Sequence, residues 1–285
     1  MTDQAAKLRA QMNGTAKKQA KTIAIVSGKG GVGKSNFAIN FSLALIEQKK
    51  KVLLFDLDIG MGNIDILIGK TSRYSIVDLL DKNHSIYDMI ESGPNTLYYL
   101  SGGRGLDQIF RLEKDQTNHF LKELETVFED YDYIIFDMGA GVTNDSIQFI
   151  LASDECIVLT TTEPTAITDA YSMMKHILKQ KVLPLNLVIN RASNQKNGMD
   201  IMNRITKAVQ HFLKSPIYPL GVVPEDSAVR QAVMEQKPFL LHQPKSKASI
   251  AIQTIAKQFL GANDSTEKPS SSSFLTRLRK FLKER

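Results

Sequence analysis

The residues with the clearest chemical purpose form the run Ser27–Ser35, which reads Ser-Gly-Lys-Gly-Gly-Val-Gly-Lys-Ser. Gly28, four further residues and then Gly33-Lys34-Ser35 have the spacing of a phosphate-binding loop. Glycines let successive backbone N–H groups turn toward one anion, and a helix N-terminus behind them adds partial positive charge. Lys34 can reach the β- and γ-phosphates of a nucleotide, and the Ser35 hydroxyl can bind Mg²⁺. The run therefore predicts a site for a nucleotide with Mg²⁺.

The segments on either side supply the strand and the helix that such a loop requires. Thr22–Val26 is apolar and β-branched, which predicts a buried strand, and Asn36–Gln48 carries apolar residues at helical spacing. A plain glycine turn is the alternative, and the lysine, the serine and both flanks disfavour it. The predicted phosphate contacts are Gly28, Lys29, Gly30, Gly31, Val32, Gly33, Lys34, Ser35 and Asn36.

Acidic residues end two further predicted strands. Lys51–Asp56 leads into Asp56-Leu57-Asp58, and Tyr133–Asp137 leads into a glycine-rich turn. Ligands bind at the carboxyl ends of the strands in open α/β sheets, so we expect these acids beside the phosphate loop. Carboxylates in that place hold Mg²⁺ or its waters and position an attacking water. An aspartate that only caps the following turn is the alternative for Asp56 and Asp58. The predicted metal-site residues are Ser35, Asp56, Asp58 and Asp137.

A second lysine, Lys29, directly follows Gly28, so the loop resembles the deviant Walker A box of the MinD/ParA group of ATPases. In that group the extra lysine reaches across a nucleotide-sandwich dimer to the partner's phosphates, so the resemblance implies homodimerisation with ATP. It also implies that Asp58 orients the attacking water, that Asp56 supports the magnesium shell and that Asp137 binds Mg²⁺ through water. The catalytic residues expected from it are Asp58, Lys29 and Lys34. A solvated loop charge is the alternative for Lys29.

Three later segments resemble the base-binding part of the same group. The predicted strand 185–191 ends in Asn190-Arg191, the pair that reads adenine there; an amide can bond the adenine edge and a guanidinium can stack on the ring. The strand 217–223 continues into Pro224, and this turn resembles a main-chain adenine clamp. The resemblance also implies that Glu163 contacts the ribose of the partner's nucleotide and that Arg230 lies against the base. The contacts expected from these segments are Glu163, Asn190, Arg191, Val223, Pro224, Glu225 and Arg230.

The composition limits the classes of protein to which this sequence can belong. The 285 residues are 42% hydrophobic and 23% charged, which is ordinary for a globular protein, and no run of 18 apolar residues predicts a membrane-spanning helix. The polar N-terminus lacks the apolar core of a secretory signal. The single cysteine, Cys156, excludes an intramolecular disulfide and fits a reducing cytoplasm. It also excludes an iron–sulfur carrier of the related class, which needs a Cys-x-x-Cys pair.

The net charge of +6 is concentrated in the two tails. Residues 1–22 carry five Lys/Arg and one Asp, and residues 264–285 carry six Lys/Arg and three Asp/Glu, which leaves −1 for residues 23–263. Basic tails contact nucleic acid, anionic lipid or acidic partners. A ParA-type DNA-segregation protein would need a basic surface on the folded body, so the near-neutral body argues against nucleic acid as a partner.

The N-terminal tail holds Asp3-Gln4-Ala5-Ala6-Lys7-Leu8-Arg9. A solvated, frayed tail is the alternative reading of so short a segment. The segment nevertheless resembles the DQAxxLR motif of the flagellar-number ATPases, the FlhG (YlxH or FleN) family. There the motif engages the signal-recognition-type GTPase FlhF and stimulates its GTP hydrolysis. The partner-binding residues that this resemblance implies are Asp3, Gln4, Ala5, Leu8 and Arg9.

The C-terminal tail combines a serine-rich stretch, residues 261–273, with the basic amphipathic run 274–285. The first reads as a flexible linker and the second as a helix for an anionic membrane surface. Packing of the helix on its own domain is the alternative, and both states can hold in turn, docked in a monomer and released in an ATP dimer. The predicted membrane-facing residues are Phe274, Leu275, Leu278, Phe281 and Leu282.

Together these patterns predict a doubly wound α/β fold with a mostly parallel sheet in one domain, residues 22–260, preceded by an extension over residues 1–21. The function expected is that of a cytoplasmic Mg-ATPase switch that associates peripherally with the membrane in its ATP state. The resemblance implies control of flagellar number and placement, with an FlhF-type GTPase and flagellar C-ring proteins as partners. A MinD-type cell-division ATPase and a ParA-type DNA-segregation ATPase are the alternatives, and the N-terminal motif speaks against the first.

Overall fold

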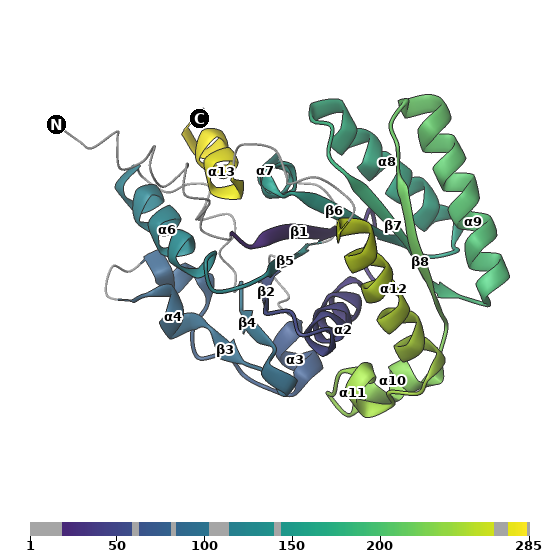
Figure 1. Ribbon diagram of the computed structural model, residues 1–285, viewed down its shortest axis with the longest axis horizontal. Coiled ribbons are helices and arrows are strands. Elements are labelled where there is room, and N and C mark those ends of the chain that lie inside the picture. Colours follow the sequence, from purple (N-terminus) through teal and green to yellow (C-terminus); the bar gives the residue numbers. More distant parts are fainter. Residues whose placement is uncertain are drawn as a thin grey trace.

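The computed structural model describes residues 19–58, 63–80, 84–102, 114–139, 144–264 and 273–283 (Figure 1). The N-terminal motif at residues 3–9, the loop at residues 59–62, the turn at residues 140–143 and the segment 265–272 lie outside the described residues. The predictions made for those segments therefore stay predictions.

The core of the described fold is one eight-stranded sheet with the strand order β3-β4-β2-β5-β1-β6-β7-β8. All neighbouring strands run parallel except β3 and β4, which pair antiparallel. The strands are β1 (Lys21–Val26), β2 (Val52–Leu57), β3 (Glu91–Ser92), β4 (Tyr98–Leu100), β5 (Tyr133–Met138), β6 (Glu155–Thr160), β7 (Leu185–Ala192) and β8 (Tyr218–Pro224). The predicted doubly wound, mostly parallel architecture is confirmed.

Helices cover both faces of this sheet, which is why the central strands β2 and β5 are buried along their whole length. One face is covered by α4 (Ile86–Met89), α6 (Lys114–Val127), α7 (Asn144–Ala152), α8 (Pro164–Gln180), α9 (Gln195–Ala208) and α13 (Phe274–Lys283). The other is covered by α2 (Lys34–Glu47), α3 (Ile64–Ile68), α10 (Ser227–Met234), α11 (Phe239–His242) and α12 (Lys247–Asp264). Short 3₁₀ turns at Ile76–Leu80 and Pro94–Thr96 and a π-turn at Val209–Leu213 complete the described elements.

The order of the strands indicates which end of the sheet binds a ligand. On one side of β1 the sheet continues with β5, β2, β4 and β3, and on the other side with β6, β7 and β8, so the direction of winding reverses at β1. Open α/β sheets bind their ligands at the carboxyl ends of the strands at such a reversal. The phosphate loop follows β1 at this end, and Asp56 and Asp137 lie in register on β2 and β5 beside it.

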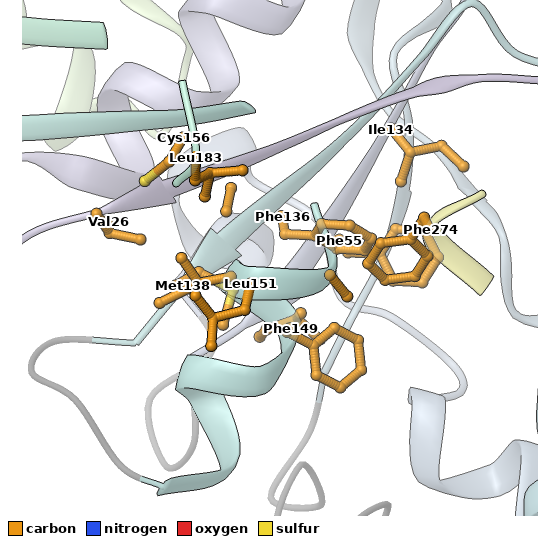
Figure 2. Close-up of a cluster of buried hydrophobic side chains, with 14 of the residues drawn as sticks. Val26, Phe55, Ile134, Phe136, Met138, Phe149, Leu151, Cys156, Leu183 and Phe274 are labelled. Carbon is orange, nitrogen blue, oxygen red and sulfur yellow. The ribbon is translucent and has the colours of Figure 1, made fainter. Parts of the chain in front are cut away.

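The C-terminal helix α13 is docked on the body of the protein, where it packs against α6 and α7. Phe274 and Leu278 are 2% and 0% exposed, and Phe281 and Leu282 pack partly buried against the same apolar cluster. Figure 2 shows the ring of Phe274 in a group with Phe55 and Phe136. The alternative that the sequence left open, packing of the tail on its own domain, is therefore the state that this structure shows.

A partly buried ion pair fixes the first turn of α13. The guanidinium of Arg277 lies 2.5 Å from Asp154 Oδ1 and donates through Nε to the carbonyl of Ala152, 2.6 Å away. Asp154 in turn accepts from the backbone N–H and the hydroxyl of Thr22 in β1. The helix before the linker, α12, runs to Asp264, so the predicted start of the linker at residue 261 is four residues too early. Among the described residues, no helix is both long and apolar enough to cross a bilayer.

Candidate nucleotide-binding site

The loop between β1 and α2 depends on glycine at two residues with left-handed backbone. Gly31 has φ +78° and Gly33 has φ +91°, a region that L-residues with a side chain rarely adopt. Gly33 also serves as the N-cap of α2, and a Cβ there would lie 2.6 Å from Nδ2 of Asn190. The backbone can curl ahead of the helix N-terminus only because these residues are glycines, which confirms the local structure that the motif requires.

Gly28 has a different role, because its backbone lies directly on helix α8. A Cβ at this position would come within 2.2 Å of the backbone carbon of Asp169 and within 2.7 Å of the backbone nitrogen of Ala170. No side chain fits there without moving a helix. The first turns of α8 therefore support the phosphate loop.

The side chains of Lys34 and Asp137 form a buried ion pair under the loop. Lys34 Nζ lies 2.8 Å from Asp137 Oδ1, with side-chain exposures of 7% and 0%. Burial raises the pKa of the Asp137 carboxyl, while the charge of Lys34 and hydrogen bonds from Lys34 and Ser35 oppose that rise. The second carboxylate oxygen, Oδ2, is buried and has no hydrogen-bond partner in the structure.

That unpartnered oxygen is what a magnesium ion or one of its waters would satisfy, and it lies beside the Ser35 hydroxyl that the motif assigns to Mg²⁺. Hard oxygen donors of this kind suit Mg²⁺, so Ser35 and Asp137 fit the ion. The described residues contain no group of three or more His, Cys, Asp or Glu side chains that could hold a metal by themselves. When bound, the ion would neutralise charge on the phosphates.

Asp56, the other predicted metal-site acid, holds the following segment in place. Its Oδ1 accepts the backbone N–H of Asp58 at 3.1 Å and its Oδ2 accepts that of Ile64 at 3.3 Å. Burial, followed by the charge of Asp137, raises the pKa of Asp56 to about 7. Gly102 leaves room for this arrangement, since a Cβ there would lie 1.9 Å from the carbonyl oxygen of Asp56.

Asp58 lies on the phosphate side of the loop. A cavity of about 400 Å³ contains it together with Gly30, Lys34 and Ser35, and Ile66 of α3 stands at its edge. Because Asp56 anchors its backbone N–H, Asp58 follows β2 in one fixed direction. The structure therefore brings Asp58 to the place where a carboxylate could hold a water near the terminal phosphate of a nucleotide.

Lys29 does not line that cavity. Its Nζ donates to the hydroxyl of Thr165 at 3.1 Å and lies 3.5 Å from Glu163 Oε2, at the start of α8. Both charged groups are solvent-accessible, with 43% and 57% of the side chain exposed. Glu163, expected from the family resemblance at the partner's ribose, thus contacts the lysine of its own chain here. Thr165 was not predicted, since nothing in the sequence distinguishes it from other helix-start threonines.

The residues predicted to bind the base surround a second cavity, of about 320 Å³, on the other side of the loop. Asn190 Nδ2 donates to the carbonyl of Val32 at 2.8 Å, which leaves the amide oxygen and the second amide hydrogen for a base. Arg191, at φ +54°, turns its guanidinium toward the loop. The predicted residues in its lining are Gly31, Gly33, Asn36, Asn190, Arg191, Val223, Pro224, Glu225 and Arg230.

Apolar residues that the sequence did not mark complete the wall of this cavity. Phe37, Val229, Phe239 and Ile252 come from α2, α10, α11 and α12. Asp226 joins two of these elements, because its carboxylate accepts the backbone N–H of Ala228 in α10 and of Ala248 in α12. These residues have ordinary helical spacing in the sequence, so only the fold shows that they share one cavity.

A phosphate loop between a strand and a helix, with a buried lysine–aspartate pair at the ends of parallel strands, defines a P-loop nucleotide hydrolase. A family model described as "ParA: NUBPL iron-transfer P-loop NTPase" matches residues 18–260. The chain belongs to this ParA family and is an ATP hydrolase of the MinD/ParA class. The chain's one cysteine, Cys156, is buried in β6, so the chain lacks the Cys-x-x-Cys pair that an iron–sulfur carrier of the related class needs.

Individual relatives agree with this assignment. The antiactivator FleN of Pseudomonas aeruginosa is 29% identical over 84% of this chain and 85% of its own length. The flagellum site-determining protein YlxH of Helicobacter pylori is 34% identical over 92% of this chain and 90% of its own length. Among solved structures, the septum site-determining protein MinD of Pyrococcus horikoshii complexed with Mg-ADP is 25% identical in sequence. It covers 87% of this chain and 100% of its own, with a TM-score of 0.67. The predicted resemblance to the MinD/ParA group and its flagellar members is confirmed, and membership of a P-loop NTPase family implies that the chain binds a nucleotide.

Proposed function

We propose that the protein is an ATP-driven switch that forms a homodimer through Lys29 and helps to set the number and position of flagella. The observation that supports the homodimer is the position of Lys29. Its ammonium group is half-exposed at the surface and lies outside the phosphate cavity of its own chain. Its contacts to Glu163 and Thr165 are weak, since exposed ion pairs contribute at most about 1 kcal/mol. Lys29 can therefore leave these contacts and bind a partner's phosphates at a small cost in free energy.

Light scattering on the full chain with ATP and Mg²⁺ tests the dimer. Lys29→Gln should bind ATP nearly as the parent does and stay monomeric, while Lys122→Gln, an exposed lysine on the remote helix α6, should dimerise. If Lys29→Gln dimerises like the parent, the lysine does not act between protomers and this part of the proposal fails.

The second part of the proposal concerns α13 and the membrane. The helix is docked by its apolar face, so membrane binding requires its release from α6 and α7. We infer that ATP-driven dimerisation releases it, and that two released helices on one dimer bind an anionic bilayer where one helix binds weakly. The serine-rich segment before the helix is long enough in sequence to let it leave.

Co-sedimentation with vesicles of phosphatidylglycerol and phosphatidylcholine tests this release. The parent should sediment with ATP and much less with ADP, and added salt should weaken the binding. Phe281→Glu should abolish sedimentation without preventing the ATP dimer, whereas Phe212→Glu, at a phenylalanine 70% exposed on the body, should leave it unchanged. Equal sedimentation in ADP and ATP would contradict the switch.

The flagellar role rests on relatives and on the N-terminal motif. FleN is called an antiactivator and YlxH a flagellum site-determining protein, and both align over most of this chain. We propose that Asp3, Gln4, Ala5, Leu8 and Arg9 stimulate an FlhF-type GTPase and that flagellar C-ring proteins bind the same chain. Deleting residues 1–21 should leave ATP hydrolysis intact and remove the stimulation of GTP hydrolysis. Unchanged stimulation would return the segment to a solvated tail and favour the division-site alternative.

A further inference from the structure

Strand β8 forms one edge of the sheet as the structure describes it, and it pairs with β7 alone. An edge strand presents backbone N–H and C=O groups that lack a partner strand. Between Pro219 and Pro224 the strand carries no charged side chain. The carbonyl of Pro219 accepts a hydrogen bond from the Gln258 side chain of α12 at 3.3 Å, so it points away from β7. That carbonyl is thus already partnered, and Pro219 and Pro224 have no backbone N–H to donate, so the edge is open to a further backbone only between these two prolines.

Helices α9 and α12 flank this strand and form a groove of about 470 Å³ beside it. Both helices are seated closely: a Cβ on Gly198 of α9 would lie 2.3 Å from Val222, and a Cβ on Gly221 would lie 2.4 Å from Ile255 of α12. The groove is thus fixed in shape. Its apolar lining consists mainly of Met199, Met202, Leu220, Ile250, Ala251 and Ile255.

Part of this apolar lining is exposed at the mouth of the groove. Met199 is 37% exposed and Ile250 is 54% exposed, and Tyr218 at the start of the strand is 52% exposed. Met199 and Ile250 line the groove from the helices on its two sides, and Tyr218 directly precedes the lining residue Pro219, so the exposed apolar surface adjoins the groove.

The groove also has a positive rim. The two flanking segments, residues 195–218 and 245–258, together carry seven Lys/Arg and one Asp. Lys247 lines the groove directly. Lys196 precedes Met199 by three residues and Lys257 follows Thr254 by three, so each lies on the side of its helix next to the groove. None of the seven cations forms an ion pair with a described acidic residue.

This rim differs from the charge of the body as a whole, which is −1 over residues 23–263. A positive charge of +6 in the two flanking segments is balanced by negative charge elsewhere on the body. The near-neutral sum therefore conceals an excess of positive charge in the two segments that flank the groove, and cations without an ion-pair partner among the described residues attract an acidic ligand.

We infer that this groove binds an extended acidic segment of a partner protein, which adds to β8 as a further strand. Backbone hydrogen bonds to the open edge would provide affinity, and alternate apolar side chains would enter the groove while acidic ones face the lysines. A second copy of this chain would bring two positive rims together, which is repulsive. A nucleic acid would satisfy the lysines and leave the apolar lining and the strand edge unused.

Fluorescence anisotropy of the full-length protein tests the inference with a labelled octapeptide in which valine and glutamate alternate. We expect saturable binding that weakens when salt is raised to about 1 M, where the Debye length falls to about 3 Å. Lys247→Glu and Ile250→Glu should each weaken binding about tenfold or more, because both residues line the groove and each change adds a negative charge facing an acidic peptide. Matched variants at other exposed positions, Lys122→Glu and Val182→Glu, should bind like the parent.

Two further probes separate the modes of binding. The same octapeptide with N-methyl groups on alternate backbone nitrogens should lose binding, because strand addition needs those N–H groups. A version with lysine in place of glutamate should also fail. The inference is overturned if the octapeptide does not bind, if the methylated or lysine version binds equally well, or if duplex DNA competes with equal strength in a manner that depends on both Lys247 and Ile250.

Discussion

The ring of Phe274 in α13 stacks on the ring of Phe136, the residue directly before Asp137, with centroids 5.0 Å apart. The same Phe274 ring stacks on Phe128, directly after α6, at 5.4 Å and lies 6.1 Å from Phe149 of α7. The docked tail therefore shares its apolar core with the strand that carries a metal-site acid. Because protein cores are close-packed, release of the helix would leave a vacancy beside that strand.

We expect Phe274→Ala to lower the free energy of unfolding of the nucleotide-free protein by about 3–5 kcal/mol, the usual cost of truncating a buried phenylalanine. Phe212→Ala, on a ring that is 70% exposed, should change it by less than about 0.5 kcal/mol. Urea unfolding followed by circular dichroism measures both. Equal stability of the two variants would mean that α13 is not docked in solution.

The buried pair of Lys34 and Asp137 predicts a non-additive result. Lys34→Met should abolish nucleotide binding and also destabilise the nucleotide-free protein, because it leaves a buried carboxylate without its cation at a cost of about 3–5 kcal/mol. Adding Asp137→Asn should restore much of that stability and none of the binding. Thermal unfolding of the two single variants and the double variant measures the coupling, and additive losses would contradict it.

Much of this site could be predicted because its chemistry is local in sequence. Gly33, Lys34 and Ser35 are adjacent, and Asp56, Asp58 and Asp137 each lie at or just after the end of a continuous apolar run that predicts a buried strand. Because the carboxyl ends of parallel strands meet at one edge of the sheet, the predicted strand ends were enough to predict that these acids lie close together.

The parts that could not be predicted depend on contacts between distant segments. The backbone of Gly28 lies on α8, and Asp226 joins α10 to α12, yet no local pattern marks either contact. The docking of α13 was left open for the same reason. An amphipathic helix suits a bilayer and a protein groove equally well, and the groove consists of residues from α6 and α7.

Asp58→Ala should separate binding from chemistry. Asp58 lines the phosphate cavity but forms no part of the buried pair that holds the loop, so its loss should leave ATP affinity within about threefold of the parent. Hydrolysis should fall by about 10²-fold or more, the usual contribution of a group that handles the attacking water. Equilibrium binding of a fluorescent ATP analogue and steady-state phosphate release measure the two effects. Loss of binding in parallel with hydrolysis would refute the water-positioning role.

Gly28 and Gly31 offer a matched pair of substitutions in one loop. Gly28→Ala places a Cβ within 2.2 Å of the α8 backbone, whereas a Cβ at Gly31 meets nothing within 4 Å and is strained only by its φ of +78°. The first should therefore lower the free energy of unfolding by several times the roughly 1 kcal/mol expected of the second. Urea midpoints compare them, and a smaller loss for Gly28→Ala would show that α8 does not bear on the loop.

Asp56 predicts how stability depends on pH. Burial and the neighbouring charge of Asp137 raise the pKa of Asp56 from 3.8 to about 7 in the folded protein. The folded state therefore holds a proton at pH values where the unfolded state has released it. Between about pH 4 and pH 7 the unfolded chain binds fewer protons at this residue, so stability falls as the pH rises, by up to about 1.4 kcal/mol per pH unit.

Asp56→Asn removes this dependence, because an amide stays neutral across the window. The amide keeps one acceptor for the backbone N–H groups of Asp58 and Ile64 and loses the other, which adds a cost that does not change with pH. The variant should therefore be less stable than the parent near pH 4 and should approach or exceed it above pH 7. Urea unfolding of both proteins without nucleotide, in the presence of EDTA, measures the difference at intervals across the window. Two parallel curves would mean that Asp56 is already ionised near pH 4 in the folded protein, and that its two backbone hydrogen bonds outweigh its burial.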